Sequence, residues 1–200
     1  MLRARLGSHA SRDVWSEEDD LALAVAAKTD RAAFGVLYDR YVHRVYGYCY
    51  RLLQTPEAAE DATSQVFTKA LAALPRFRDD GPSFGAWLFA IAHNVVIDEF
   101  RAARRALWPA ATAVTADDAP GPEETAVVAE AVRELRAVLS QLSADQANVI
   151  ELRLTGLTDK EIAFVLGRAR GAVRVAQHRA VRRLRALLGV EPRSKVSRDA

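Results

Sequence analysis

Residues 158–185 read TDKEIAFVLGRARGAVRVAQHRAVRRLR, a stretch that predicts a helix, a tight turn and a longer second helix. Thr158 and Glu161 have the spacing of a capping box, which starts a helix. Gly167 is suited to end that helix in the left-handed conformation. The second helix repeats its apolar residues at steps of three and four, which predicts one buried face. These residues are Val173, Ala176, Ala180, Leu184 and Leu187.

The other side of the second helix is strongly basic. Arginines occupy positions 168, 170, 174, 179, 182, 183 and 185, with no acidic residue among them. A helix-turn-helix whose second helix is apolar behind and basic in front fits the DNA major groove, where arginine binds phosphates or guanine edges. A solvated helix of an ordinary bundle is the alternative, but a neutral surface does not need so many arginines. The stretch therefore favours DNA binding.

The composition of the chain limits which fold classes and which functions are possible. The 200 residues carry a net charge of only +2, so acidic residues elsewhere offset the basic segment. Half of the chain is hydrophobic with little strand-like alternation, which predicts an all-α fold. The single cysteine, Cys49, excludes an internal disulfide and suits a cytoplasmic location. No phosphate-binding glycine loop, nucleophile motif or metal-ligand spacing is present, so we expect no enzyme activity, cofactor or metal. The absence of an apolar run of about 20 residues predicts no membrane insertion.

Hydrophobic periodicity and capping residues predict four helices in the first half of the chain. They span residues 17–27, 31–53, 56–74 and 84–107, with a loop at 76–83. Two points stay open. The tyrosines at helical spacing in 31–53 suit either a core or a binding surface. The helix at 84–107 is apolar on more than one side, so it is either central in its bundle or carries an exposed aromatic face.

A change of composition marks a domain boundary. Residues 108–124 are rich in Ala, Thr and Pro and read as a flexible linker. We therefore expect two small helical domains, at 17–107 and 125–188, with a disordered N-terminus at 1–16 and a polar tail at 189–200. Beyond the linker we expect a helix at 125–139. A capping box at Ser143 and Gln146 then opens a helix that ends near Leu154.

Three blocks of sequence resemble a known family when taken in order. Residues 59–71 (AEDATSQVFTKAL) are similar to region 2.2 of the bacterial sigma-70 family. Residues 84–101 (FGAWLFAIAHNVVIDEFR) are similar to regions 2.3 and 2.4, and residues 142–185 to region 4. Together they resemble a group IV, or extracytoplasmic-function (ECF), sigma factor over about residues 20–188.

The resemblance implies a non-catalytic subunit that binds core RNA polymerase and directs it to the −10 and −35 elements of promoter DNA, followed by DNA melting and initiation. It also implies an anti-sigma factor as a further partner. It assigns core binding to Glu60, Asp61, Ser64 and Gln65. The common family pattern has glutamine and an acid where this chain has Ser64 and Gln65, so one charge is lost from this surface.

The resemblance also assigns two DNA-binding sets. The candidates for the −10 element are Phe77, Trp87, Asn94, Asp98, Arg101 and Arg104, and a core role for Trp87 stays open. The candidates for the −35 element are Arg170, Arg174, Val175, His178 and Arg179. Ala172 stands where threonine is usual, and Ala176 and Gln177 replace a basic and an apolar residue. We therefore expect an altered −35 preference.

A one-component helix-turn-helix transcriptional regulator is the alternative function. Its N-terminal half would sense a ligand or form a dimer, and it would bind DNA tightly without polymerase. Such a regulator would not need the 84–101 block.

Overall fold

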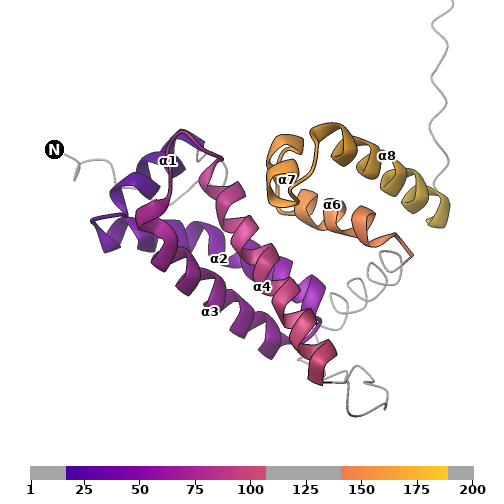
Figure 1. Cartoon of the computed structure of the whole chain (residues 1–200), viewed down its shortest axis with the longest axis horizontal. Helices are drawn as coiled ribbons and strands as arrows, with labels where there is room; N and C mark the ends of the chain where they lie inside the picture. The colour runs from indigo at the N-terminus through magenta and orange to yellow at the C-terminus, as the bar shows by residue number, and fades with distance from the viewer. Residues whose placement is uncertain (1–16, 107–140, 189–200) are drawn as a thin grey trace, which may run out of the picture.

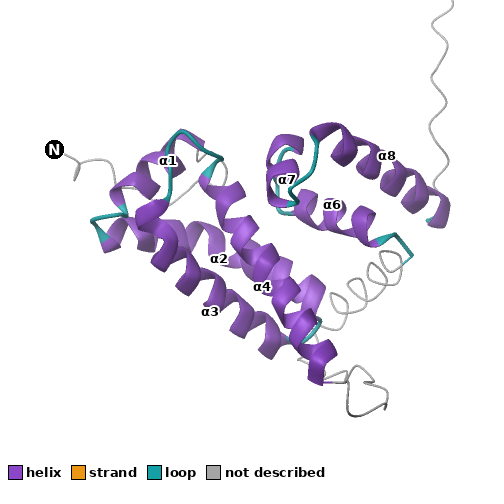
Figure 2. Cartoon of the chain, viewed as in Figure 1, coloured by secondary structure: helices purple, strands orange, loops and turns teal. Residues whose placement is uncertain are grey.

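The computed structural model describes residues 17–106 and 141–188, and all regular structure within these ranges is helical (Figure 2). The predicted all-α fold is therefore confirmed. The expected N-terminus at 1–16, linker at 108–124, helix at 125–139 and tail at 189–200 lie outside the described residues, as does Leu107. The helices, in order, are α1 Glu17–Ala26, α2 Arg31–Leu53, α3 Pro56–Ala73, the 3-10 helix η1 Leu74–Arg76, α4 Phe84–Ala106, α6 Ala144–Leu154, α7 Asp159–Val165 and α8 Arg170–Leu187 (Figure 1).

The helices of the first half begin where capping side chains are available. Asp30 accepts a hydrogen bond from the Ala32 amide at 2.9 Å, and Ser83 accepts one from the Ala86 amide at 3.2 Å. Thr55 caps α3, which has Pro56 at its first position. The predicted starts of α2, α3 and α4 are confirmed. The α-helical geometry of α3 ends one residue earlier than expected, because Pro75 lies in the 3-10 turn that follows.

Local signals also define the helix-turn-helix. Complete capping boxes open α6 at Ser143 and α7 at Thr158. Gly167 has a φ of 60°, and the Arg168 amide beyond it bonds back to the Ala163 carbonyl at 2.9 Å. This six-residue closure is the Schellman arrangement that ends a helix. The turn between α7 and α8 is therefore built as the sequence predicts.

Helix α4 is central in its bundle. It packs against α3, α2 and α1, and also against α7 of the C-terminal half. Two of its lines of side chains are buried, which explains why it is apolar on more than one side. The fully buried members are Phe84, Leu88, Phe89, Ala92, Val95 and Val96. Phe100 near its C-terminal end is 50% exposed, so α4 is central over most of its length but not at its end.

The two helical units pack on one another and share a continuous core. Val149, Leu152 and Ile162 of the C-terminal unit belong to the same buried cluster as the residues of α2 and α4. Polar contacts reinforce the packing: Arg51 Nε lies 2.5 Å from Glu151 Oε2, and Arg44 Nε donates to the Thr155 carbonyl at 3.1 Å. The amino-acid sequence did not reveal this orientation, because each of these contacts joins residues about a hundred positions apart.

A buried polar pair lies inside the first unit. The Tyr48 hydroxyl and His93 Nδ1 are 2.9 Å apart, and His93 is only 9% exposed. Burial lowers the pKa of His93, because charging the ring there would remove it from water. His93 is therefore a neutral member of the core, outside the surfaces considered for binding.

We expect acidification to destabilise the fold partly through His93. An unfolded histidine takes up a proton near pH 6.5, whereas folded His93 resists protonation until the pH is lower. The unfolded state then binds more protons, so stability falls as the pH drops below about 6.5. Thermal melts between neutral pH and about pH 5 should show a smaller loss for His93→Gln than for wild type. His43→Gln, at an exposed position, is the control, and an equal loss in all three proteins would refute this role.

Candidate polymerase and nucleic-acid interfaces

An apolar groove runs between α2 and α3. Its volume is about 550 Å³. Tyr38 and Leu71 are 42% and 40% exposed along it, and the Tyr38 and Phe67 rings meet with their centroids 4.6 Å apart. Glu60 and Ser64, two of the four core-binding candidates, also line it. The tyrosines of α2 therefore have two kinds of position. Tyr41 and Tyr48 are buried in the core, whereas Tyr38 lines this groove.

The groove has a polar edge near Glu60. The pKa of Tyr46, another lining residue, is raised by partial burial and then by the Glu60 carboxylate. The other two candidates, Asp61 and Gln65, are exposed on a neighbouring line of α3. Gln65 donates to Glu99 of α4 at 3.0 Å. The four candidates thus lie on adjacent lines of one helix, with only Glu60 and Ser64 at the groove.

An aromatic cluster lies at the start of α4. Trp87 is partly buried, with its ring centroid 5.2 Å from that of Phe77 and 5.5 Å from that of Phe84. Phe77 itself is only 3% exposed. The expectation that Phe77 contacts the −10 element therefore does not fit its position, because its ring is already covered by Phe84 and Trp87. Trp87 keeps an accessible portion, so it is both a packing residue and a candidate contact.

Beyond the aromatic cluster, α4 carries a polar line. Asn94, Asp98 and Arg101 are exposed, and Arg101 lies 3.4 Å from Asp98. Arg104, the last candidate for the −10 element, lies on the helical backbone, but its side chain is outside the described residues. Three of the polar candidates for the −10 element therefore lie on one exposed line of α4.

The loop before α4 faces the helix-turn-helix unit. Asp79, Asp80 and Ser83 line a hollow of about 580 Å³ together with Lys160 and Phe164 of α7. The Ser83 hydroxyl also donates a hydrogen bond to Glu161. Burial alone would raise the pKa of Glu161, but the bonds from Ser83 and from the Thr158 cap together outweigh it, so the pKa is lowered. In this conformation α7 therefore lies against one side of the loop that precedes the α4 candidates for the −10 element.

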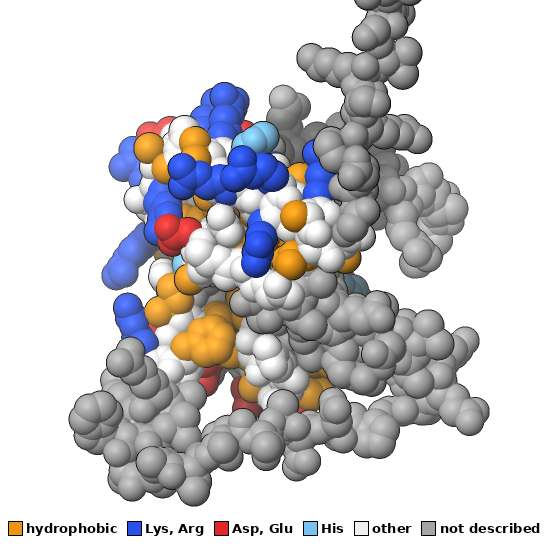
Figure 3. Space-filling view, turned by 90° about the vertical axis from the view of Figure 1, so that its right-hand side faces the viewer, with side chains coloured by type: hydrophobic (Ala, Val, Ile, Leu, Met, Phe, Trp, Pro, Cys, Tyr) orange, Lys and Arg blue, Asp and Glu red, His pale blue; other side chains and the backbone are white. Residues whose placement is uncertain are grey.

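The basic face of α8 is exposed as predicted. Figure 3 shows Lys and Arg side chains gathered over the helix-turn-helix unit at the top of the view. A shallow groove of about 360 Å³ lies beside α8, lined by Arg179, Arg182 and Arg183. All five candidates for the −35 element are exposed: Arg170, Arg174, Val175, His178 and Arg179.

Acidic residues from other helices pair with two arginines of the basic stretch at 168–185. Asp145 of α6 lies 2.6 Å from Arg168, and its pKa is lowered by that bond. Asp159 of α7 lies 3.0 Å from Nε of Arg174. The sequence reading missed both pairs, because the segment from 168 to 185 contains no acid and nothing in the spacing links it to Asp145. Only Asp159, one residue after the Thr158 cap, is close enough in sequence to have been suspected.

Comparison with known proteins supports the family assignment. Sigma-70 region 2 matches residues 37–106, and sigma-70 region 4 matches residues 132–184. The ECF RNA polymerase sigma factor ShbA of Streptomyces griseus is 39% identical over 188 residues, covering 84% of this chain and 97% of ShbA. The chain belongs to the ECF sigma factors. It is accordingly an RNA polymerase sigma factor that directs promoter recognition and transcription initiation.

Further relatives agree with this assignment. SigD of Mycobacterium tuberculosis, also an ECF RNA polymerase sigma factor, is 37% identical over 182 residues, covering 88% of this sigma factor and 86% of SigD. Among solved structures, the sigma factor RpoE of Bartonella quintana, in complex with the anti-sigma factor NepR, is similar with a TM-score of 0.68 and 25% identity, over 80% of this chain and 98% of that one. CnrH, in complex with the cytosolic domain of CnrY, has a TM-score of 0.66 and 27% identity, over 86% and 99%.

Within residues 17–106 and 141–188, no three His, Cys, Asp or Glu side chains are grouped to hold a metal ion. None of the helices in those ranges is long and apolar enough to cross a membrane.

Proposed function

We propose that this sigma factor binds core RNA polymerase through α3 and the α2–α3 groove, the −10 element through α4, and the −35 element through α8. The observation that carries the proposal is the separation of the two DNA-facing surfaces onto different helical units. Asn94, Asp98 and Arg101 lie on α4, whereas Arg170, Arg174 and Arg179 lie on α8. Residues 17–107 would form the −10 and core-binding domain, and 125–188 the −35 domain.

The groove suits the polymerase contact because it combines apolar area with a polar edge. Protein interfaces commonly place buried aromatic side chains at the centre and polar groups at the rim. The exposed Tyr38 and Leu71 would supply the apolar centre. The polar rim would consist of Glu60, Asp61, Ser64 and Gln65. The solved complexes of RpoE with NepR and of CnrH with CnrY favour an anti-sigma factor as another partner here. The same function places the protein in the cytoplasm and assigns it no catalytic step.

Free protein is expected to bind promoter DNA weakly. Each DNA-facing surface is small, and core polymerase would hold both at the correct spacing, which raises the effective concentration of the second contact. The test compares DNA binding by the free protein and by its complex with core, followed by transcription from a promoter library. Core-dependent, promoter-specific transcription is the expected result. Tight, sequence-specific DNA binding without core would contradict the proposed division of DNA binding between two weak surfaces.

Asp61→Arg is expected to weaken core binding at least tenfold while leaving the fold intact. Asp61 is exposed on α3, so reversal of its charge costs little stability. A complementary partner would instead meet a like charge, which costs about 1.4 kcal/mol for each tenfold loss of affinity. A binding titration against core measures the effect, and a thermal melt checks the fold.

Asp80→Arg is the matched control for this charge reversal. Asp80 is also exposed, but it lies in the loop before α4 and pairs with Arg78 at 2.7 Å. Its replacement should leave the affinity for core unchanged in the absence of DNA. Equal affinities of the Asp61 and Asp80 variants for core would remove α3 from the proposed interface.

A further inference from the structure

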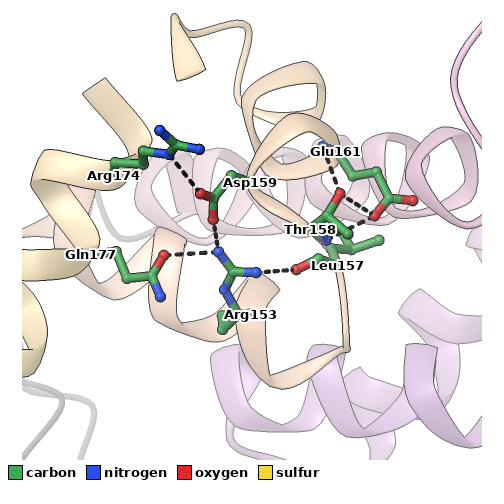
Figure 4. Close-up of polar contacts among 7 residues, drawn as sticks. All are labelled: Arg153, Leu157, Thr158, Asp159, Glu161, Arg174 and Gln177. Atoms are coloured by element: carbon green, nitrogen blue, oxygen red, sulfur yellow. Dashed lines mark hydrogen bonds and ion pairs between the residues drawn. The ribbon is translucent and has the colours of Figure 1, made fainter. Parts of the chain in front are cut away.

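Two side chains of α8 are held from behind by residues of α6 and α7 (Figure 4). Asp159 accepts a hydrogen bond from Arg174 Nε through Oδ2 at 3.0 Å and one from Arg153 through Oδ1. Arg153 also donates to Gln177 Oε1 at 2.8 Å and to the Leu157 carbonyl at 2.9 Å. One carboxylate and one guanidinium thus connect three helices beneath the basic face.

The contact to Asp159 sets the direction of Arg174. The Asp159 side chain is 21% exposed and the Arg174 side chain 63% exposed, so the carboxylate lies behind and the guanidinium points outward. Asp159 occupies Nε, and no hydrogen bond or ion pair within the described part of the chain occupies the two terminal nitrogens. Those nitrogens form the end of the fork that pairs with O6 and N7 of guanine. Asp159 therefore presents Arg174 in an end-on orientation.

The contact to Arg153 sets the orientation of the Gln177 side-chain amide. Arginine only donates hydrogen bonds, so the Gln177 atom that faces Arg153 must be its carbonyl oxygen. The amide nitrogen is then left as the group that can reach a base. Bidentate recognition of adenine needs both the oxygen and the nitrogen of a glutamine amide. Gln177 in this setting is therefore suited to donate to an acceptor on guanine, thymine or a phosphate.

An acid beside a DNA-binding helix would ordinarily weaken binding, because it repels the phosphates. Asp159 avoids much of this repulsion because two arginines share its carboxylate. Its position is explained if it orients a base-reading side chain. Building on the proposed −35 role of α8, we propose that Asp159 and Arg153 are positioning residues that set the base preference of Arg174 and Gln177.

The test uses the full-length protein with core RNA polymerase and a promoter library randomised in the −35 element. Wild type should select guanine at one −35 position, and Arg174→Ala should lose that preference by about 5- to 150-fold. Asp159→Asn has the same shape but lacks the charge, and should lose about 3- to 10-fold, a part of the bidentate contribution. In the Arg174→Ala background, Asp159→Asn should have no further effect on that position, because the side chain it orients is absent.

Two further variants separate base reading from folding and from phosphate contact. Asp145→Asn breaks the exposed pair with Arg168 in the same unit and should leave base preference unchanged. Arg174→Lys keeps the charge but lacks the planar fork and the Nε that bonds to Asp159, so it should weaken guanine preference while retaining affinity for DNA of any sequence. Guanine preference equal to that of wild type in Arg174→Lys would mean that the orientation of the fork by Asp159 does not matter.

The outcomes distinguish a failure of the positioning role of Asp159 from a failure of the proposed −35 function on which it rests. If wild type gives no core-dependent transcription from any library member, the proposed function fails. If wild type initiates but Asp159→Asn keeps its guanine preference, only the positioning role is overturned. An Asp159→Asn chain that no longer melts cooperatively would also overturn it, because the network would then serve the fold alone.

Discussion

Trp87→Ala should slow promoter opening by about 5- to 150-fold, the equivalent of one base-stacking contact, while sparing formation of the closed complex. Trp87 retains an accessible portion at the start of α4, beside the exposed line that begins at Asn94. In the proposed function this surface supports the melted strand, so removal of the indole acts on opening rather than on initial docking. Permanganate footprinting of the −10 region measures opening directly.

Phe84→Ala is the matched variant that separates packing from DNA contact. Phe84 is 1% exposed and its ring meets those of Tyr41, Phe77 and Trp87. Truncation of a buried phenylalanine costs about 3–5 kcal/mol, so this variant should lower the melting temperature far more than Trp87→Ala. If Trp87→Ala unfolds to the same extent, or loses the closed complex as well, Trp87 is a core residue and not a strand contact.

Glu151→Ala should loosen the packing of the two helical units. Glu151 is nearly buried, with a side chain 5% exposed, and it pairs with Arg51 across the domain contact at 2.5 Å. Removal of one partner from a buried ion pair costs about 3–5 kcal/mol, because the other charge is left without compensation. The expected cost here is smaller, because the Arg51 side chain is 22% exposed and water can reach it. Small-angle X-ray scattering should report a larger radius of gyration.

Two comparisons make the Glu151 experiment specific. The double variant Arg51→Met and Glu151→Met removes both charges and keeps apolar bulk, so it should remain more compact than Glu151→Ala. Arg168→Ala removes an exposed ion pair within the helix-turn-helix unit and should leave the scattering unchanged. Unchanged scattering of Glu151→Ala would mean that apolar contacts alone, such as those of Leu152 and Ile162, hold the units together.

The domain contact also bears on how the protein meets a promoter. Helix α7 lies beside the loop that contains Asp79, Asp80 and Ser83, and the two segments line one hollow. The proposed function requires α4 and α8 to engage separate DNA elements. We therefore expect Glu151→Ala, if it opens the protein, to leave the −10 and −35 preferences unchanged, because it alters neither DNA-facing surface.

The amino-acid sequence by itself determined the helices, their caps and the family. The capping boxes at Ser143 and Thr158, the proline at 56 and the left-handed Gly167 act over a few residues, so their effects are readable from local spacing. The exposed basic face of α8 follows from the same helical periodicity. The exposed candidates on α3 and α4 came from the family resemblance, which rests on the order of three sequence blocks.

Only the tertiary structure decided which faces meet. Periodicity marked both apolar lines of α4, but their burial depends on α7 as well as on the first bundle. Phe77 was expected at the DNA and lies in the core, because two aromatic neighbours cover it. Seven arginines without an intervening acid suggested a face free of carboxylates, yet Asp145 and Asp159 reach it from other helices. Side-chain pairing across helices depends on how whole helices pack, and spacing along the chain carries no record of that packing.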